Sequence, residues 1–332
     1  MNGVFIFRYT GLSILAVLLL MASIGAIING AFRIDTGSVF GYLGGVPHAL
    51  NEIEKNVLFS IRLPRVLLGI FAGAALGIAG AVMQAIFRNP LAEPGLVGLT
   101  AGASLGAVAA IVLSAGSFIF ITVSAFICSS VTTYITYLLG RISNSVSGLI
   151  LAGIAMNAVV FSIVGLVLIH ANDAQLRDLT FWNMGSLSAA NWKMLGLLCP
   201  LMTITILILM CRWRALNALL LGEREAHHLG FEVKKTRSQL ILLVALTVGP
   251  ITAVTGGIGF VGLVMPHLVR MWLGADHRWV LPASALSGAL ALTLADWFAR
   301  VLISPAELPI GLLTSLVGGP FFIWLLMKGH AR

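Results

Sequence analysis

The sequence predicts an all-α, polytopic membrane protein with about ten transmembrane helices and both termini in the cytoplasm. Of its 332 residues, 59% are hydrophobic and only 10% are charged, and the mean hydropathy is +1.02. A soluble domain is about one quarter charged, so little of this chain can form a water-exposed domain. A helix of ~20 apolar residues spans a bilayer. We therefore treat residues 1–332 as a single transmembrane domain.

Ten apolar runs account for this count. They lie at about 9–31, from 57 onward, 95–113, 118–139, 148–169, 194–210, from 240 onward, 258–273, 280–303 and 309–327. The first run could be a secretory signal, but its length and the many runs behind it favour an uncleaved helix. Gly249-Pro250 and Gly256-Gly257 interrupt the seventh run, so its boundary with the eighth is the least defined.

The second run carries small residues on one face. Gly69, Gly73 and Gly77 recur at four-residue spacing, so a neighbouring helix can approach the backbone closely. We expect this helix to be buried.

The charges indicate which side each link faces. Most of the 20 Lys and Arg fall in links that this layout places on one side, and the positive-inside rule assigns that side to the cytoplasm. Residues 33–56 and 170–192 then face outward. The net charge of +8 follows from this asymmetry, and no basic, aromatic-rich soluble face is present to bind nucleic acid.

One basic link, 212–237, interrupts two long apolar runs. It holds six of the Lys and Arg, so it must lie outside the bilayer and, by its charge, in the cytoplasm. Residues 215–221 are predicted as a short apolar turn, and a second short helix follows between two glycines. Two short elements across the inner face make a docking surface. The second helix comprises Gly222, Glu223, Arg224, Glu225, Ala226, His227, His228, Leu229 and Gly230.

No phosphate-binding loop of the form GxxxxGK[ST] occurs, so this chain does not bind and cleave ATP by that route. Any nucleotide energy must come from another polypeptide, which would arrive at the 212–237 link. The three cysteines have neither disulfide nor metal-ligand spacing. His227 and His228 point about 100° apart on a helix, which favours packing or interface roles over a metal site.

Four motifs occur in order along the chain. They are RLPR at 62–65, GAVMQ at 80–84 leading into RNPLAEP at 88–94, GFVGLVMPHLVR at 259–270, and ELPIG at 307–311. Together they resemble the signatures of the FecCD-type permeases, the membrane subunits of bacterial ABC importers for iron-siderophores, heme and vitamin B12. The resemblance covers nearly the whole chain.

The resemblance implies a multi-pass permease of the bacterial inner membrane that works as a homodimer within lipid. A periplasmic substrate-binding protein would dock outside, and two ATP-binding subunits would dock inside, with 222–230 as the coupling helix. Those subunits would hold ATP and Mg²⁺, so we expect no catalytic residue, metal or cofactor in this chain. Iron or heme would be cargo, moved by alternating access.

Three arginines are candidates for docking the binding protein. Arg62 and Arg65 flank a proline at the outer end of a helix, where they could accept acidic side chains, although snorkelling explains them almost as well. Arg177 lies in the outward link, whose DAQLRDLTFWNMGSL run resembles the heme-importing branch. It could meet a heme propionate or a carboxylate of the binding protein, while Phe181 and Trp182 fit an interfacial aromatic belt.

The substrate path should be apolar and sparsely charged, since a tight site would retain the cargo. Candidates for it are Met83, Gln84, Asn157, Met265 and His267. His267 could act as a transient heme ligand, but a hydrogen-bonded structural role is favoured. Asp296 lies four residues before Arg300, and an ion pair explains this embedded acid better than a proton relay does.

We therefore expect ATP-driven import of heme, with a ferric siderophore or vitamin B12 as alternative cargoes. A proton-coupled secondary transporter using Asp296 is the alternative of another class. An intramembrane hydrolase is disfavoured because the sequence has no HExxH or paired membrane Asp motif.

Overall fold

The computed structural model describes residues 2–46, 49–114, 117–142, 146–304 and 306–329. Within these ranges every regular element is a helix and no strand occurs, which confirms the all-α class. Met1 and residues 330–332 lie outside the described residues, and the cytoplasmic location of both termini stays a prediction.

Each predicted apolar run corresponds to one helix. Among the described residues, seven helices are long and apolar enough to cross a bilayer, whereas the apolar stretches at 99–113, 261–273 and 310–325 are shorter, so the number of ten spans stays a prediction. The bounds are α1 (Asn2–Ile28), α4 (Leu63–Phe87), α5 (Leu99–Ser114), α6 (Phe118–Ile142), α7 (Val146–Leu168), α9 (Trp192–Cys211), α12 (Val233–Thr255), α13 (Val261–Leu273), α14 (His277–Val301) and α15 (Ile310–Gly329).

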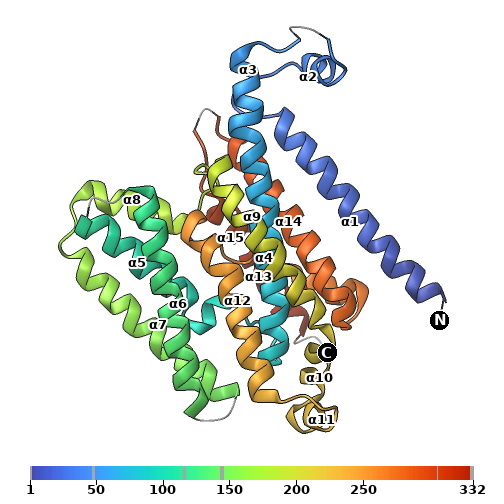
Figure 1. The fold of residues 1–332 in the computed structure, drawn as a ribbon, viewed down its shortest axis with the longest axis vertical. Coiled ribbons are helices and arrows are strands. Elements are labelled where there is room, and N and C mark those ends of the chain that lie inside the picture. Colours follow the sequence, from blue (N-terminus) through green and yellow to red (C-terminus); the bar gives the residue numbers. More distant parts are fainter. Residues whose placement is uncertain (1, 47–48, 115–116, 143–145, 305, 330–332) are drawn as a thin grey trace.

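Helix α4 runs through the middle of the molecule (Figure 1). It continues α3 (Glu52–Asn56) and the π-helical turn η1 (Val57–Arg62), so 52–87 forms one rod. Almost all of α4 is buried, as its glycine stripe predicted. Gly73 and Gly77 face the backbone of Gly288 and Ser284 on α14, where an added Cβ atom would collide. Small residues thus allow the two helices to pack closely.

Helix α12 differs from the prediction at its start and in its middle. It begins at Val233 rather than near 240, and it runs unbroken through the buried Gly249-Pro250 pair. Membrane helices tolerate such a proline where neighbouring groups compensate the freed backbone carbonyl. The helix ends at Thr255, because Gly256 adopts a positive φ of 72° that favours glycine, and 256–260 is not helical.

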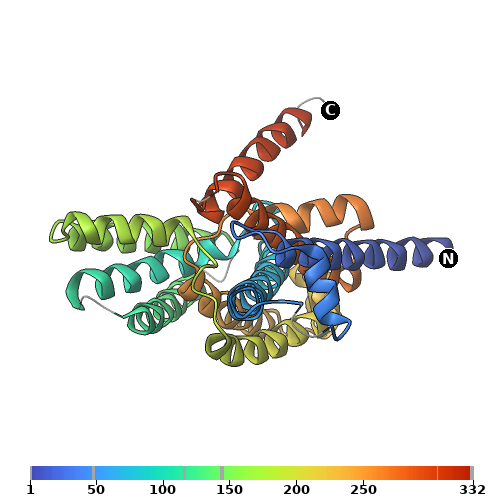
Figure 2. The same ribbon diagram turned by 90° about the horizontal axis from the view of Figure 1, so that it is seen from above.

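Helices α6, α7 and α15 lie at the periphery. Figure 2 shows α15 leaning away from the bundle, and only 17% of the apolar window of α7 is buried. Their outer faces carry large apolar side chains such as Leu151, Leu166 and Leu316. Faces of this kind are covered by lipid or by another subunit.

Short helices mark opposite ends of the molecule. Helix α2 (Thr36–Leu43) and α3 lie at one end, and α10 (Trp213–Leu221) with α11 (Glu223–His228) lie at the other (Figure 1). The turn η2 (Pro94–Val97) precedes α5, and α8 (Asp173–Met184) is tied to the end of α5 by a hydrogen bond from Gln175 Nε2 to the Ile111 carbonyl (3.1 Å). The links 33–56 and 212–237 are therefore at opposite ends, as the charge pattern predicted.

Candidate functional site

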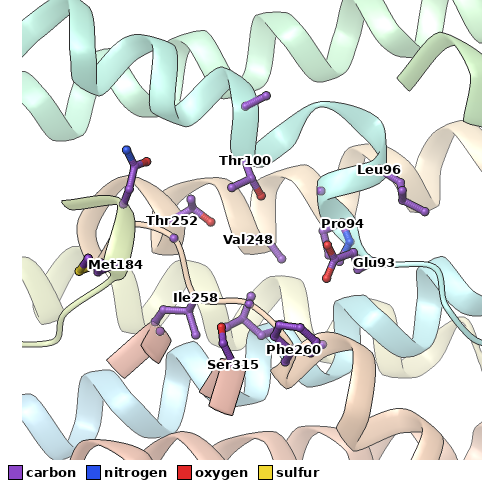
Figure 3. Close-up of a pocket in the computed structure, with 18 of the residues that line it drawn as sticks. Glu93, Pro94, Leu96, Thr100, Met184, Val248, Thr252, Ile258, Phe260 and Ser315 are labelled. Atoms are coloured by element: carbon purple, nitrogen blue, oxygen red, sulfur yellow. The ribbon is translucent and has the colours of Figure 1, made fainter. Parts of the chain in front are cut away.

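A cavity of about 500 Å³ lies among α4, α7, α12, α13 and α15, beside η2 (Figure 3). The non-helical link between α12 and α13 forms one wall, and in Figure 3 its Ile258 lies across the cavity from Thr100 and Leu96. Irregular backbone occurs at membrane depth where it lines a cavity or is buried in protein. Two hydrogen bonds hold the neighbouring links: Ser186 N to the Thr255 carbonyl (2.7 Å) and Ile310 N to the Gly185 carbonyl (3.1 Å).

The cavity wall is mainly apolar. Among the described residues that line it, none is Lys, Arg or His. Its polar side chains are Glu93, Thr100, Asn157, Asn183, Thr252 and Ser315. A surface of this composition can accept a bulky, largely apolar molecule without holding it by charge, which fits a passage better than a storage site.

Two asparagines contribute side-chain amide groups to the wall. Asn157 Nδ2 donates to the Gly95 carbonyl (3.1 Å), while its Oδ1 is buried without a hydrogen-bond partner among the described residues. Asn183 Oδ1 accepts from Ser104 Oγ (3.2 Å). Asn157 therefore keeps one acceptor available.

Glu93 is the one acidic residue of the cavity wall, within the part of the chain described. Its carboxyl is partly buried in the link between α4 and η2, and it forms no ion pair with the described residues. Burial raises the pKa of this carboxyl above its ordinary value, since desolvation disfavours the charged form. The wall is thus nearly uncharged when Glu93 holds its proton.

Of the five residues predicted for the path, the structure places Asn157 in the cavity wall and the other four elsewhere. Met83 is fully buried between α4 and its neighbours, and Gln84 is buried, bonding the Leu263 carbonyl (3.1 Å) and accepting from the Arg270 guanidinium. Met265 lines a separate apolar groove of about 340 Å³ among α13, α14 and α15. The His267 ring packs edge-on against Phe321, with centroids 6.1 Å apart.

Met83 and Gln84 lie on the central helix α4, where helix packing buries their side chains, whereas Met265 and His267 on α13 are only partly buried. A place for these four residues in the substrate path stays a prediction. Sequence reasoning missed Glu93 and Asn183 as lining residues, although both lie inside the RNPLAEP and DAQLRDLTFWNMGSL runs that carried the family resemblance.

The docking candidates Arg62 and Arg65 are buried and held internally, so neither snorkels. Arg65 Nε lies 2.8 Å from Asp296 Oδ1, and its Nη1 lies 2.9 Å from Glu307 Oε2. Arg62 donates to the carbonyl oxygens of Ile27 (2.9 Å) and Phe32. Docking through these two arginines stays a prediction, and it would require a partner to displace those internal acceptors.

Asp296 is paired, as its spacing predicted. Arg300 Nε lies 3.0 Å from Asp296 Oδ2, and Arg65 completes the cluster from α4. Arg177 differs from the other two docking candidates because its side chain is exposed on α8 and has no ion pair among the described residues. It is free to meet a partner.

The predicted docking surface consists of two short helices, as expected. Helix α10 buries its apolar face, including Leu216 and Leu219. Helix α11 buries Ala226 and exposes its charged side chains, and Leu229 beyond it is 59% exposed. The Glu223 carboxylate lies 2.6 Å from Arg237 Nη2 on α12. No group of His, Cys, Asp and Glu able to hold a metal occurs in the described ranges.

A helical membrane bundle with a mainly apolar cavity and two short helices exposed at one end is typical of a membrane transport protein, and this one lacks an ATP-binding loop of its own. The chain belongs to the FecCD transport family, which matches residues 15–328. It is therefore an ABC importer permease, a multi-pass protein of the bacterial inner membrane. In this family ATP hydrolysis lies in a separate subunit, and the family implies ATPase partners and a binding protein.

Relatives cover almost the entire chain. The hemin transport system permease protein HmuU of Yersinia pestis is 42% identical over 323 residues, covering 96% of this chain and 95% of that protein. The vitamin B12 import system permease protein BtuC of Citrobacter koseri is 38% identical, with coverage of 96% and 94%. A solved structure described as an inward-facing conformation of a metal-chelate type ABC transporter is 34% identical, with a TM-score of 0.85 and coverage of 96% and 98%.

Proposed function

We propose that this chain is the membrane subunit of an ATP-driven heme importer. The observation that carries the proposal is the 42% identity to the hemin permease along nearly the full chain. Arg177 adds support, since it is exposed on α8 in the run that resembles the heme-importing branch. A guanidinium at that position can pair with a propionate of heme or with a carboxylate of the binding protein.

Vitamin B12 is the second candidate cargo. The B12 permease of Citrobacter koseri is 38% identical to this chain over a similar length, and the cavity wall has no cation to meet the two propionates of heme. A ferric siderophore is the third, because iron-chelate importers share the family.

In the proposed cycle, two ATP-binding subunits bind to the coupling surface, which is formed by α10 and α11. When these subunits bind ATP and Mg²⁺, they move together, and α10 and α11 move with them. The helices around the cavity then tilt, so that the cavity opens to the opposite side of the membrane. This chain would contribute no catalytic group, cofactor or resident metal. Charged contacts for the ATP-binding subunits would come from Glu223, Arg224 and Glu225 of α11.

A second copy of the chain would complete the path. Phe161 on α7 and Ser315 on α15 both line the cavity and are exposed in the single chain, and both helices have largely unburied outer faces. A homodimer that joins these faces along a two-fold axis would enclose the cavity. Lipid would cover the remaining apolar surface.

The alternative of a proton-driven transporter requires Asp296 to carry the proton, and the ion pairs of this residue argue against that role. Asp296 pairs with two buried guanidiniums, from Arg65 and Arg300. Such a carboxylate is neutralised in place, so a proton relay through it would first have to break both pairs.

The deciding experiment purifies the chain with its ATP-binding subunits and its binding protein. Visible spectra are recorded after loading with heme and removal of unbound heme, and uptake into liposomes is followed with and without ATP. A Soret band together with uptake that needs ATP would support the proposal. Saturating heme without a Soret band would remove heme as cargo, and uptake that follows a pH gradient without the ATPase would favour the proton-driven class.

A further inference from the structure

One side chain of helix α10, Asn217, forms hydrogen bonds with the start of α14. Its Nδ2 donates to Asp276 Oδ1 (2.8 Å), while its Oδ1 accepts from the backbone N–H of His277 (2.9 Å) and lies 3.0 Å from His277 Nδ1. Asp276 is the N-cap of α14, and His277 is its first residue. Both polar atoms of one amide therefore join the short helix to the start of a transmembrane helix.

The surroundings favour a stiff joint. Leu216 and Leu219 are buried beneath α10, and His277 is 1% exposed. Asp276 also accepts from the Arg278 backbone N–H (3.0 Å). The Asp276 side chain is 35% exposed and also lies 3.8 Å from Arg8, whereas the His277 side of the joint is closed to water. A polar group that loses its partner on that buried side is not readily compensated by water, so α10 and the start of α14 should move together.

Helix α14 can pass a displacement on to α4. Along its middle, Ser284 and Gly288 abut the backbone of Gly77 and Gly73. Towards its far end, Asp296 pairs with Arg65 of the same rod at 2.8 Å. Packed helices with no space between them respond to a push as a unit.

Helix α11 is attached in a different way. Gly222 separates it from α10 with a positive φ of 124°, a conformation that favours glycine. Its side-chain contacts with the bundle are the buried methyl group of Ala226 and the Glu223–Arg237 ion pair, in which the Glu223 side chain is 43% exposed and that of Arg237 is 12% exposed. This is a smaller buried surface than the four buried side chains of α10 provide. Of the two short helices, α10 is therefore the one built into the bundle.

We propose that Asn217 is a positioning residue that transmits movement of the coupling link to α14 and, through α14, to α4. This inference rests on the proposed ATP-driven import. When the ATP-binding subunits draw α11 and α10 along, the Asn217 joint makes α14 follow, and the cavity beside α4 changes shape. Without the joint, α10 slides on its apolar face, so ATP is hydrolysed with little transport.

The test uses the full complex with its ATP-binding subunits and binding protein in liposomes. ATP hydrolysis and uptake are measured on the same vesicles with heme as the probe, or with cyanocobalamin if the unmodified complex takes up only that. We expect Asn217→Ala to lower the cargo moved per ATP about fivefold or more, with hydrolysis changed less than about twofold. An unmodified complex without ATP-dependent uptake would count against the proposed function and not against the joint.

Asn191→Ala is the matched control. Asn191 caps α9 by accepting from the Met194 N–H (3.0 Å), so the variant loses a helix cap but no joint to α14. We expect its ratio of transport to hydrolysis to equal that of the unmodified complex. An equal ratio in Asn217→Ala would overturn the proposal.

A pair of exchange variants tests the joint independently of the alanine variant. Asn217→Asp sets two carboxylates against each other and should uncouple the complex. When Asp276→Asn is added, the new amide at position 276 can donate to the new carboxylate at position 217, which reverses the direction of the original hydrogen bond. Asparagine can still cap α14, so coupling should return. A double variant that assembles and hydrolyses ATP but stays uncoupled would refute the role of Asn217.

Discussion

Asp296 is the centre of a buried ionic cluster near the end of α14. It accepts from Arg65 at 2.8 Å and from Arg300 at 3.0 Å, and Glu307 pairs with Arg65 at 2.9 Å. Because two buried cations share the Asp296 carboxylate, its removal leaves Arg300 without a neutralising partner and leaves Arg65 with the partly exposed Glu307 only. Glu307 is 42% exposed, so water can replace part of its contribution.

The cluster predicts an unequal pair of variants. Asp296→Asn should lower the free energy of unfolding by about 3–5 kcal/mol, since breaking a buried ion pair leaves uncompensated charge. Glu307→Gln should cost less than about 1 kcal/mol. Thermal unfolding of the purified chain in detergent measures both, and equal losses would contradict this account.

Glu93 predicts a pH dependence. Burial raises the pKa of its carboxyl above the ordinary 4.5, so folding favours the protonated form. The resulting stability is fully present below the ordinary pKa and is lost as the pH rises through the raised pKa. Glu93→Gln, which stays neutral, should therefore be more stable than the parent at pH 8 and similar to it at pH 4.

Melting temperatures from pH 4 to pH 8 test the Glu93 prediction. Glu232→Gln is the control, because the Glu232 carboxylate is exposed at the surface beside α12 and its loss should leave the pH profile unchanged. A Glu93→Gln profile parallel to that of the parent would show that folding does not raise the pKa of this carboxyl and would contradict the prediction.

At the scale of single residues, sequence could predict what is local. The Asp296–Arg300 pair follows from helical spacing, whereas Arg65, 231 positions away from Asp296, has no spacing that reveals it. Likewise Asn157 was predicted as a path residue, but Glu93 and Asn183 were not. Their place in the cavity depends on how distant helices meet.

At the scale of elements, the packing of α4 on α14 depends on the absence of side chains. Gly73 and Gly77 face backbone atoms of α14, and Gly80 faces Gly262 of α13 in the same way. Regular glycine spacing made this face predictable.

The start of α12 could not be predicted from the sequence. Residues 233–239 are mainly polar, and a hydropathy pattern cannot distinguish a polar helical turn from a loop.

The glycine contact predicts a position-dependent cost. Gly73→Ala or Gly77→Ala should destabilise the chain by about 1–3 kcal/mol, since the new methyl group overpacks the interface with α14. Gly196→Ala on α9, where nothing lies within 4 Å of the added methyl, should be neutral or slightly stabilising, as alanine favours helix. Thermal melts compare the three variants, and a similar loss at Gly196 would rule out the packing explanation.

At the scale of the whole molecule, the coupling surface formed by α10 and α11 lies at the opposite end from α2 and α3 (Figure 1). The cavity lies between helices of the bundle. Sequence predicted that opposition from charge alone. It could not predict the cavity, because the lining residues run from Leu76 to Ser315 and come together only when the bundle is assembled.

The exposed side chain of Leu229, directly after α11, predicts where the ATP-binding subunits attach. Leu229→Ser should weaken their binding about tenfold or more, since burying a leucine contributes roughly 1.5–3 kcal/mol. Its exposure of 59% means that the melting temperature of the isolated chain should not change. Lys235→Gln, also exposed nearby, is the control, and affinity unaffected by Leu229→Ser would move the attachment site elsewhere.

The continuous rod at 52–87 has a mechanical consequence. Its 36 residues extend about 54 Å at 1.5 Å per residue, against a hydrocarbon core of ~30 Å. The rod stays helical along its whole length, through the π-helical turn η1, and it is long enough to reach both aqueous phases. A displacement of one end would then shift the other end as well, so that a protein bound on one side of the membrane would be linked through one helix to a protein bound on the other.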